Sequence, residues 1–278
     1  MGREMVVSRR ATLSLRLVAL LYLTLLLLAP LVIVFWRTFE YGVGTAWAFM
    51  TTPAAVSAFW LSILIAAIAV PLNTIFGVGA ALVLARGTTP RVGKGVLDAL
   101  IDLPFIVSPV IAGLALLLVY GQGGWFGNVF LNNGIRIIYA VPGMVIATVF
   151  VSLPFVVREV TPVLREVGDE QEEAAATLGA SSWQTFWRVT LPTIRWGLAY
   201  GVVLTTARAL GEIGAVLVVS SNVAGSTLTL PLLLYQRDDQ IGTQVTTSVY
   251  ALATELAVIS VAVLLLMTMF GSRREDAR

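Results

Sequence analysis

The chain has 278 residues, of which 58% are hydrophobic and only 12% are charged. Soluble domains carry about 25% charged residues, so this composition indicates an integral membrane protein and excludes cytosolic enzymes and free-standing nucleic-acid-binding proteins. The sequence contains no His and no Cys, which removes the usual general base, the thiolate nucleophile and the commonest metal ligands. We therefore expect no catalytic residue, no metal site and no nucleic-acid partner.

Six apolar runs are long enough to cross a bilayer core about 30 Å thick, which needs about 20 residues of helix. They cover residues 17–36, 58–84, 98–120, 137–157, 198–219 and 245–270. Because the bilayer core offers no water to backbone groups, each run is expected to be helical. The sequence therefore predicts an all-α integral membrane fold, with a tail at 1–16, one six-helix domain at 17–270 and a tail at 271–278.

Lys and Arg are distributed unevenly between the two sides of these spans. Fourteen of the 18 lie at the termini and in alternate connections, whereas the opposite side holds only Arg37, Arg136 and Arg237. Positive residues concentrate on the cytoplasmic side, so both termini are expected in the cytoplasm. Arg9 and Arg10 precede the first run as in a twin-arginine export signal, but the run is long and no clear small-residue cleavage site follows it. We therefore expect a retained first helix.

The one long polar connection covers residues 158–196 and falls on the cytoplasmic side of the expected orientation. Residues 163–178 are mostly good helix formers, and Gly179 stands where helices commonly end. Ser181 or the serine after it can cap a second short helix, which Pro192 is expected to stop. The sequence therefore predicts a helical hairpin that lies along the membrane surface.

The same connection carries a motif with defined spacing. Its residues are Glu173, Ala174, Ala175, Gly179, Val189, Leu191 and Pro192. This pattern resembles the EAA loop of ABC importer permeases, with Val189 where that family usually has Ile. The resemblance implies the type I ABC importer permease fold and a coupling helix that fits a groove on a separate ATPase subunit, with Glu173 offering charge to it. Small Ala174 and Ala175 allow close packing, and Gly179 permits a sharp turn.

Two ionisable residues lie inside the fifth expected span. Arg208 and Glu212 are four residues apart and can face each other on one side of a helix. Because charges within hydrocarbon are costly unless paired or hydrated, the two form either a structural ion pair or part of the translocation path or its gate. Asp102, at the start of the third span, is a further candidate for the path, although acidic residues also suit a helix start near the interface.

Three further segments narrow the resemblance. Residues 102–114, 207–216 and 227–231 resemble segments of the sulfate/molybdate permease group. The length and the full first helix are most similar to W-type subunits of its sulfate/thiosulfate branch. The resemblance implies a subunit that forms half of the pore of an ATP-driven, binding-protein-dependent sulfate/thiosulfate importer, multi-pass in the bacterial cytoplasmic membrane.

The resemblance also implies the partners of the chain. They are a second, homologous permease subunit in a heterodimer, two ATPase subunits, an extracytoplasmic sulfate-binding protein and membrane lipid. The phosphate-binding motif G-x-x-x-x-G-K-[ST] does not occur in the sequence, so ATP and Mg²⁺ are expected on the ATPase subunits and no cofactor on this chain.

Two alternatives stay open at this point. One is a molybdate or tungstate permease of the same group, which often works as a homodimer. The other is an ion-coupled secondary transporter that uses Arg208, Glu212 and Glu255 as a charge relay.

Overall fold

The computed structural model describes residues 9–87, 90–238 and 243–272, and these residues form helices and loops without a strand. The helices are α1 (Arg9–Leu23), η1 (Thr24–Leu28), α2 (Ala29–Phe39), α3 (Val43–Met50), α4 (Pro53–Arg86), α5 (Arg91–Ile106), α6 (Pro109–Tyr120), α7 (Gly127–Asn132), α8 (Val141–Val167), α9 (Glu170–Thr177), α10 (Ser182–Thr185), η2 (Phe186–Thr190), α11 (Leu191–Leu210), α12 (Gly214–Val219), α13 (Leu230–Asp238) and α14 (Thr243–Ser272). The prediction of an all-α chain is confirmed.

Three stretches of the described chain are long and apolar enough to cross a membrane. They are Arg16–Phe39, Pro53–Arg86 and Val141–Val167, and they overlap the first, second and fourth expected spans. The helix pair α5 and α6 qualifies as a fourth, although it is bent by 110° at its break. A shorter apolar helix, Thr247–Val263, lies within the sixth expected span. By this measure the described residues hold three spans, or four with the bent pair, whereas the sequence predicts six.

Two of the expected spans are broken. Residues 98–120 form α5 and α6 in place of one helix, because Pro109 disfavours helical backbone at the residue before it, and Ser108 is accordingly extended (φ −56°, ψ 136°). Residues 198–219 are interrupted after α11, where Gly211 ends the helix and α12 starts three residues later. Each of these two runs is therefore helical, as expected, but consists of two helices joined at a break.

The centre of the bundle is α8, which lies between α4 and α11. Val156, Val157 and Val160 of α8 are completely buried. Glycines of both neighbours approach this surface: a Cβ added to Gly77 of α4 would lie 2.7 Å from the Cβ of Val156, and one added to Gly201 of α11 would lie 3.0 Å from its Cα. The three helices are therefore packed so closely that even a methyl group would have to displace a neighbour.

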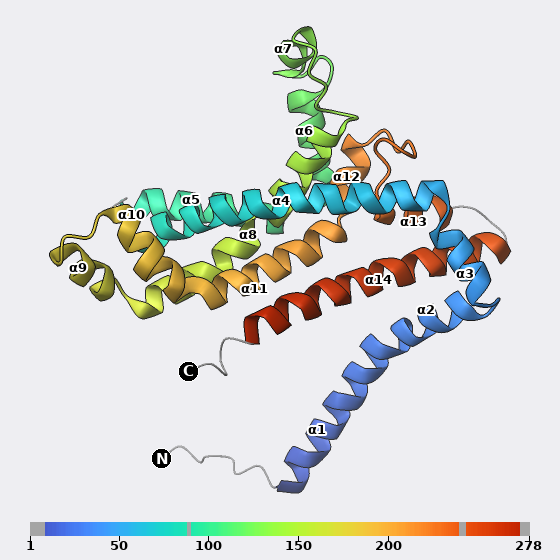
Figure 1. Cartoon of the computed structure of the whole chain (residues 1–278), viewed down its shortest axis with the longest axis horizontal. Helices are drawn as coiled ribbons and strands as arrows, with labels where there is room; N and C mark the ends of the chain where they lie inside the picture. Colours follow the sequence, from blue (N-terminus) through green and yellow to red (C-terminus); the bar gives the residue numbers. More distant parts are fainter. Residues whose placement is uncertain (1–8, 88–89, 239–242, 273–278) are drawn as a thin grey trace.

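A second core forms at the other end of α8. It includes Met144 of α8, Leu230 of α13 and Leu252 of α14, which are all buried. Beside it α6 contacts α12, and a Cβ added to Gly113 would lie 2.7 Å from the carbonyl oxygen of Ala215. This contact fixes α6 where it turns away from the bundle towards α7 (Figure 1).

The first helix run diverges from the rest of the bundle (Figure 1). The most apolar window of Arg16–Phe39 contains no buried residue. The run is attached near its end by Thr38, whose buried hydroxyl is 2.8 Å from the carbonyl oxygen of Tyr250 and 2.7 Å from the hydroxyl of Thr254, both in α14. The exposed apolar surface of this run is suited to contact with lipid or with another membrane protein.

Candidate functional site

The expected hairpin lies at one end of α4, α8 and α11 (Figure 1). The helix expected over 163–178 is divided, because Gly168 adopts φ +72° and its backbone cannot continue α8. The chain then starts again as α9, with Glu170, Glu172 and Glu173 in the first turn. Carboxylates at this position interact favourably with the positive end of the helix dipole. The prediction of one uninterrupted helix is therefore wrong, but a hairpin of two short helices does form.

The turn of the hairpin is built around Gly179. Its φ of +84° is a left-handed conformation that other residues adopt at a cost. The amide of Gly179 donates to the carbonyl of Ala176 at 3.0 Å, and the amide of Ala180 donates to the carbonyl of Ala175, also at 3.0 Å. This pair of bonds is a Schellman motif, which satisfies the last carbonyls of α9. The expectation that Gly179 supplies unusual backbone torsions is confirmed.

The second helix of the hairpin begins at Ser181 as predicted, but it does not end at Pro192. The side chain of Ser181 accepts a hydrogen bond from the amide of Gln184 at 3.4 Å, and Gln184 Oε1 accepts one from the amide of Ser181 at 2.9 Å. This capping box starts α10. The chain then widens into the π-helical turn η2 and continues directly into α11, with Pro192 in the first turn of that helix. Because proline is tolerated in a first helical turn, the prediction that Pro192 stops the helix is wrong.

The outer surface of the hairpin is open and partly apolar. Four motif residues line one groove on it: Ala174, Ala175, Val189 and Pro192. Leu178, which lines the same groove, is 89% exposed, and Trp183 beside the turn is 69% exposed. Large apolar side chains gathered on one exposed surface are typical of a protein interaction site.

Of the three motif residues outside the groove, Gly179 forms the turn, and Glu173 and Leu191 face in different directions. Glu173 is exposed, and its carboxylate makes no ion pair with another described residue. Leu191 is half-buried and packs against the core between α8 and α11. The motif therefore divides into residues that form the surface and a residue that attaches the surface to the bundle.

The structure adds an arginine that the sequence analysis did not select. Arg86, the last residue of α4, donates from Nη1 to the carbonyl of Leu164 at 2.7 Å and from Nη2 to the carbonyl of Gly168. Its Nε donates to Oε2 of Glu172 at 3.1 Å, and Oε1 of Glu172 accepts from the hydroxyl of Thr190 at 2.9 Å. Arg86 and Glu172 are 86 positions apart, so no local sequence signal joins them.

Arg208 and Glu212 are paired, as the sequence predicts. Arg208 Nη2 lies 3.0 Å from Glu212 Oε2, and the side chains are 34% and 2% exposed, respectively. Glu212 lies in the break after α11, and its Oε1 accepts a hydrogen bond from the amide of Ala215 at 2.9 Å. The carboxylate also lines a small cavity together with Thr148 and Thr229. This places a buried charge at the junction of two helices, with its partner arginine reaching towards the surface.

Asp102 lies within α5 and is not at its start. Its Oδ1 accepts a hydrogen bond from Nε of Arg158 at 2.8 Å, and Arg158 Nη2 contacts its other oxygen. Nη1 of the same arginine lies 3.0 Å from Asp98 Oδ1. One guanidinium of α8 therefore holds two carboxylates of α5, and Asp102 belongs to an ion-pair cluster that joins the two helices.

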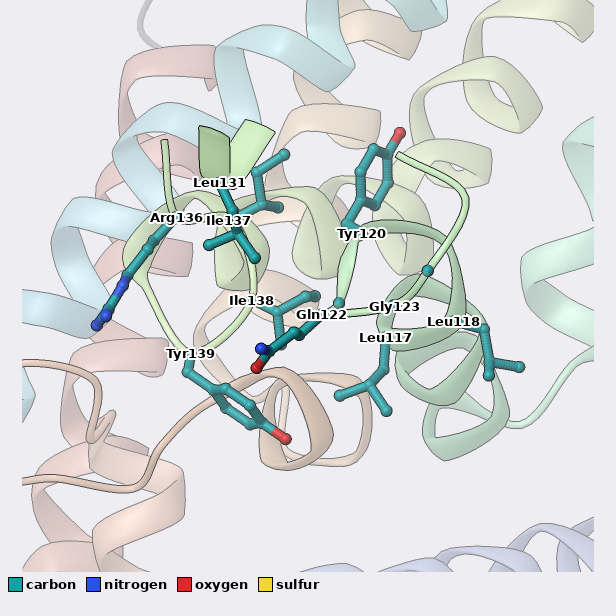
Figure 2. A pocket seen from close by; sticks show the side chains of 12 residues that line it. Leu117, Leu118, Tyr120, Gln122, Gly123, Leu131, Arg136, Ile137, Ile138 and Tyr139 are labelled. Carbon is teal, nitrogen blue, oxygen red and sulfur yellow. The ribbon is translucent and has the colours of Figure 1, made fainter. Parts of the chain in front are cut away.

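A separate pocket of about 570 Å³ lies at the far end of α6. Figure 2 shows Gln122 and Ile138 near its middle, whereas Arg136 points away from Gln122. Tyr139, in the same wall, has φ +61°, and its amide donates to the carbonyl of Val219 at 2.7 Å. None of the expected site residues lines this pocket, and the glycines at 121, 123 and 124 are a sequence signal for part of the loop that forms it.

The fold agrees with comparisons to known proteins. Residues 73–276 match the family described as "Binding-protein-dependent transport system inner membrane component". The chain is 51% identical to the sulfate transport system permease protein CysW of Synechocystis sp., over 92% of this chain and 91% of that protein. It is 36% identical to the permease protein CysT of the same organism, over 92% and 89% of the two chains.

Among solved structures, the fold is similar to a chain of a bacterial alginate ABC transporter in complex with an alginate-bound periplasmic protein. The TM-score is 0.78 over 94% of each chain, at 15% sequence identity. The family match and the similarity to the sulfate permease proteins define a permease of the ABC importer class. The chain belongs to the family of binding-protein-dependent transport system inner membrane components. It is thus a membrane transport component and not an enzyme.

Proposed function

We propose that this chain is the permease subunit of an ATP-driven, binding-protein-dependent importer of sulfate and thiosulfate. The observation that carries this proposal is the 51% identity to a CysW sulfate permease protein across 92% of the chain. Because the aligned region includes nearly the whole chain, the similarity extends over the bundle, the hairpin and the break that holds Glu212. The substrate is therefore assigned by the similarity, and the mechanism is derived from the contacts of this chain.

The chain forms half of the pore and pairs with a different, homologous permease subunit. The similarity to CysT as well as to CysW within one organism supports two related subunits and hence a heterodimer. An extracytoplasmic sulfate-binding protein delivers the anion, and two ATPase subunits bind ATP and Mg²⁺. This chain needs no cofactor of its own for that division of roles.

The hairpin within 158–196 is the surface on which an ATPase subunit docks. Ala174, Ala175, Val189 and Pro192 line part of the groove with small side chains beside the exposed Leu178, and the carboxylate of Glu173 is available to pair with a cation of the ATPase. Gly179 sets the sharp turn between the two arms. A compact hairpin continuous with α11 can transmit movement of the ATPase to the membrane helices.

Arg208 and Glu212 form part of the gate. The pair lies at the break between α11 and α12, where a small change of backbone torsion changes the direction of the following segment. Arg208 is partly exposed, so its guanidinium can contact a passing anion while Glu212 keeps it in position. Binding at such a point must be weak, because a tight site would trap the anion. For Asp102, the contacts with Arg158 support a structural role in place of a role in the path.

The domain arrangement and topology follow from the same proposal. Residues 17–270 form one transmembrane domain with six crossings, of which two contain broken helices, and the tails at 1–16 and 271–278 lie in the cytoplasm. The chain resides in the cytoplasmic membrane of a bacterium. The loop between the third and fourth spans, which forms the pocket at the end of α6, then lies on the extracytoplasmic side.

Reconstitution tests the proposal. Vesicles that hold this chain, a CysT-type permease and the ATPase are expected to accumulate radiolabelled sulfate when ATP is present at the hairpin side and the binding protein is on the other side. Vesicles without ATP, or without the binding protein, provide the controls and are expected to show background uptake. Uptake that needs only a proton gradient would support the secondary transporter and contradict the proposal.

A further inference from the structure

The hairpin is joined to α8 through a point of potential rotation. Gly168 follows the last turn of α8 with φ +72°, and a Cβ at this position would meet no atom within 4 Å. The regular helix therefore ends at Gly168, and no side chain at this position packs against a neighbour to fix the direction of α9. If the ATPase moved α9, rotation of the backbone at Gly168 would let α9 turn without moving the membrane helices.

The side chain of Arg86 spans this point. Its guanidinium binds the carbonyl of Leu164 in the last turn of α8, the carbonyl of Gly168 itself, and the carboxylate of Glu172 in the first turn of α9. The last carbonyls of a helix have no partner within the helix, and a cation placed there also interacts favourably with the helix dipole. One side chain thus holds α4, the end of α8 and the start of α9 together.

The same network continues to the second arm of the hairpin. Glu172 uses its other oxygen to accept a hydrogen bond from Thr190, the last residue of η2, which is 5% exposed. The side chains of Arg86 and Glu172 are themselves only 19% and 22% exposed. Because little solvent reaches the pair, the interaction is stronger than that of an ion pair on the open surface. Both arms of the hairpin are therefore tied to the end of α4.

We propose that Arg86 is a positioning residue for transport, which locks the hairpin to α4 so that movement of the ATPase reaches the bundle. This inference rests on the proposed role of the hairpin as the ATPase docking surface. Three different acceptors are served by three nitrogens of one planar group, a geometry that the ammonium of lysine does not reproduce. Glu172 acts with Arg86 by extending the connection to Thr190.

The first experiment measures sulfate accumulated per ATP hydrolysed in vesicles that contain the complete importer. Arg86→Gln is expected to lower this ratio at least about fivefold, the lower end of typical coupling between sites, because the hairpin moves without the bundle. Arg86→Lys keeps the charge and is expected to recover less than half of the loss. Arg16→Gln is the matched control, since Arg16 is exposed on α1 and far along the chain from the hairpin, and the ratio is expected to stay at the wild-type value.

A second measurement separates positioning from general stability. The sequence has no natural Cys, so Val83→Cys on α4 and Leu178→Cys on the hairpin, which are 43% and 89% exposed, give two unique sites for spin labels. The distance distribution between the labels is expected to be narrow with Arg86 and to broaden with Arg86→Gln. If Arg86→Gln does not fold, Glu172→Gln is used in its place, since it keeps the bonds of Arg86 to the carbonyls of Leu164 and Gly168.

The outcomes are distinct. A wild-type transport ratio together with a narrow label distance in Arg86→Gln would overturn the inference, as would full recovery of both by Arg86→Lys. If the unaltered importer shows no ATP-driven sulfate uptake, the proposed function fails, and the label distances still report whether Arg86 fixes the hairpin. A broadened distance together with reduced sulfate transport per ATP supports both the positioning of the hairpin by Arg86 and the role of Arg86 in transport.

Discussion

Arg208 and Glu212 form an ion pair of 3.0 Å in which one partner is buried and the other is not. The side chain of Glu212 is 2% exposed and that of Arg208 is 34% exposed. Glu212 also accepts a hydrogen bond from the amide of Ala215, so its carboxylate holds the break between α11 and α12 on both sides. The arginine is therefore the partner that can interact with a substrate, and the glutamate is the partner that positions it.

This asymmetry predicts different effects on stability for the single change Arg208→Gln and for a double change that also replaces Glu212. Arg208→Gln leaves Glu212 buried without its cation and is expected to lower the stability of the purified protein by about 3 kcal/mol, the low end for breaking a buried pair. Arg208→Gln combined with Glu212→Gln removes both charges and is expected to recover at least half of that loss, measured by thermal unfolding in detergent.

Sulfate uptake by the double variant shows whether Arg208 and Glu212 act in the gate or have only a structural role. If Arg208 contacts the anion, the double variant is stable but its sulfate uptake stays at least about tenfold below the wild type, equivalent to about 1.4 kcal/mol. Recovery of uptake along with stability would show that the pair has only a structural role.

The turn at Gly179 gives a prediction that depends on backbone conformation alone. A Cβ at this position meets no atom within 4 Å, so only the φ of +84° opposes a side chain. Gly179→Val is expected to cost about 1–2 kcal/mol locally and to distort the turn, so that ATP hydrolysis continues while uptake falls. Gly179→Asn is the control, because asparagine tolerates this conformation, and it is expected to keep most of the uptake. Wild-type uptake by Gly179→Val would contradict the assignment of the hairpin to coupling.

Packing around α8 predicts opposite results for two neighbouring glycines of α4. Gly77→Ala places a Cβ 2.7 Å from Val156 and is expected to destabilise the bundle by about 1–3 kcal/mol. Gly79→Ala meets no atom within 4 Å and is expected to be neutral or to stabilise the helix by about 0.5–1 kcal/mol. Thermal unfolding of the two variants in the same detergent checks the difference, and equal melting temperatures would contradict the close approach of α4 and α8.

The cluster around Arg158 predicts that Asp102 is dispensable for transport. Asp102→Asn removes one charge, but Arg158 keeps its contact with Asp98. Because these side chains are more than one third exposed, the loss of stability is expected to be at most about 1 kcal/mol. Uptake by vesicles is expected to remain within about twofold of the wild type. A loss of uptake in a stably folded Asp102→Asn variant would return Asp102 to the translocation path.

Features that depend on neighbouring residues were predictable from the sequence, and those that depend on distant contacts were not. The turn at Gly179 and the cap at Ser181 involve bonds within the hairpin, and both were anticipated. Proline gave no comparable guide: Pro71 lies inside α4, whereas Pro109 coincides with a bend of 110°. The presence of a proline alone therefore does not predict whether a helix continues or bends.

The ion pairs show the same division. The pair of Arg208 and Glu212 follows from a spacing of four residues, but Arg86 and Glu172 come together from positions 86 apart. Arg158 likewise reaches Asp102 across 56 positions. The hairpin surface was therefore identified from its motif, whereas the side chain that fixes this surface to the bundle was visible only once the helices were placed.

The most direct test of the substrate is uptake of radiolabelled sulfate by cells with and without this chain, each with excess unlabelled thiosulfate or molybdate. The cells must have no second sulfate uptake system. Deletion is expected to abolish uptake, and in complemented cells thiosulfate is expected to compete strongly and molybdate only weakly. Unchanged sulfate uptake after deletion, or strong competition by molybdate alone, would contradict the assignment to sulfate.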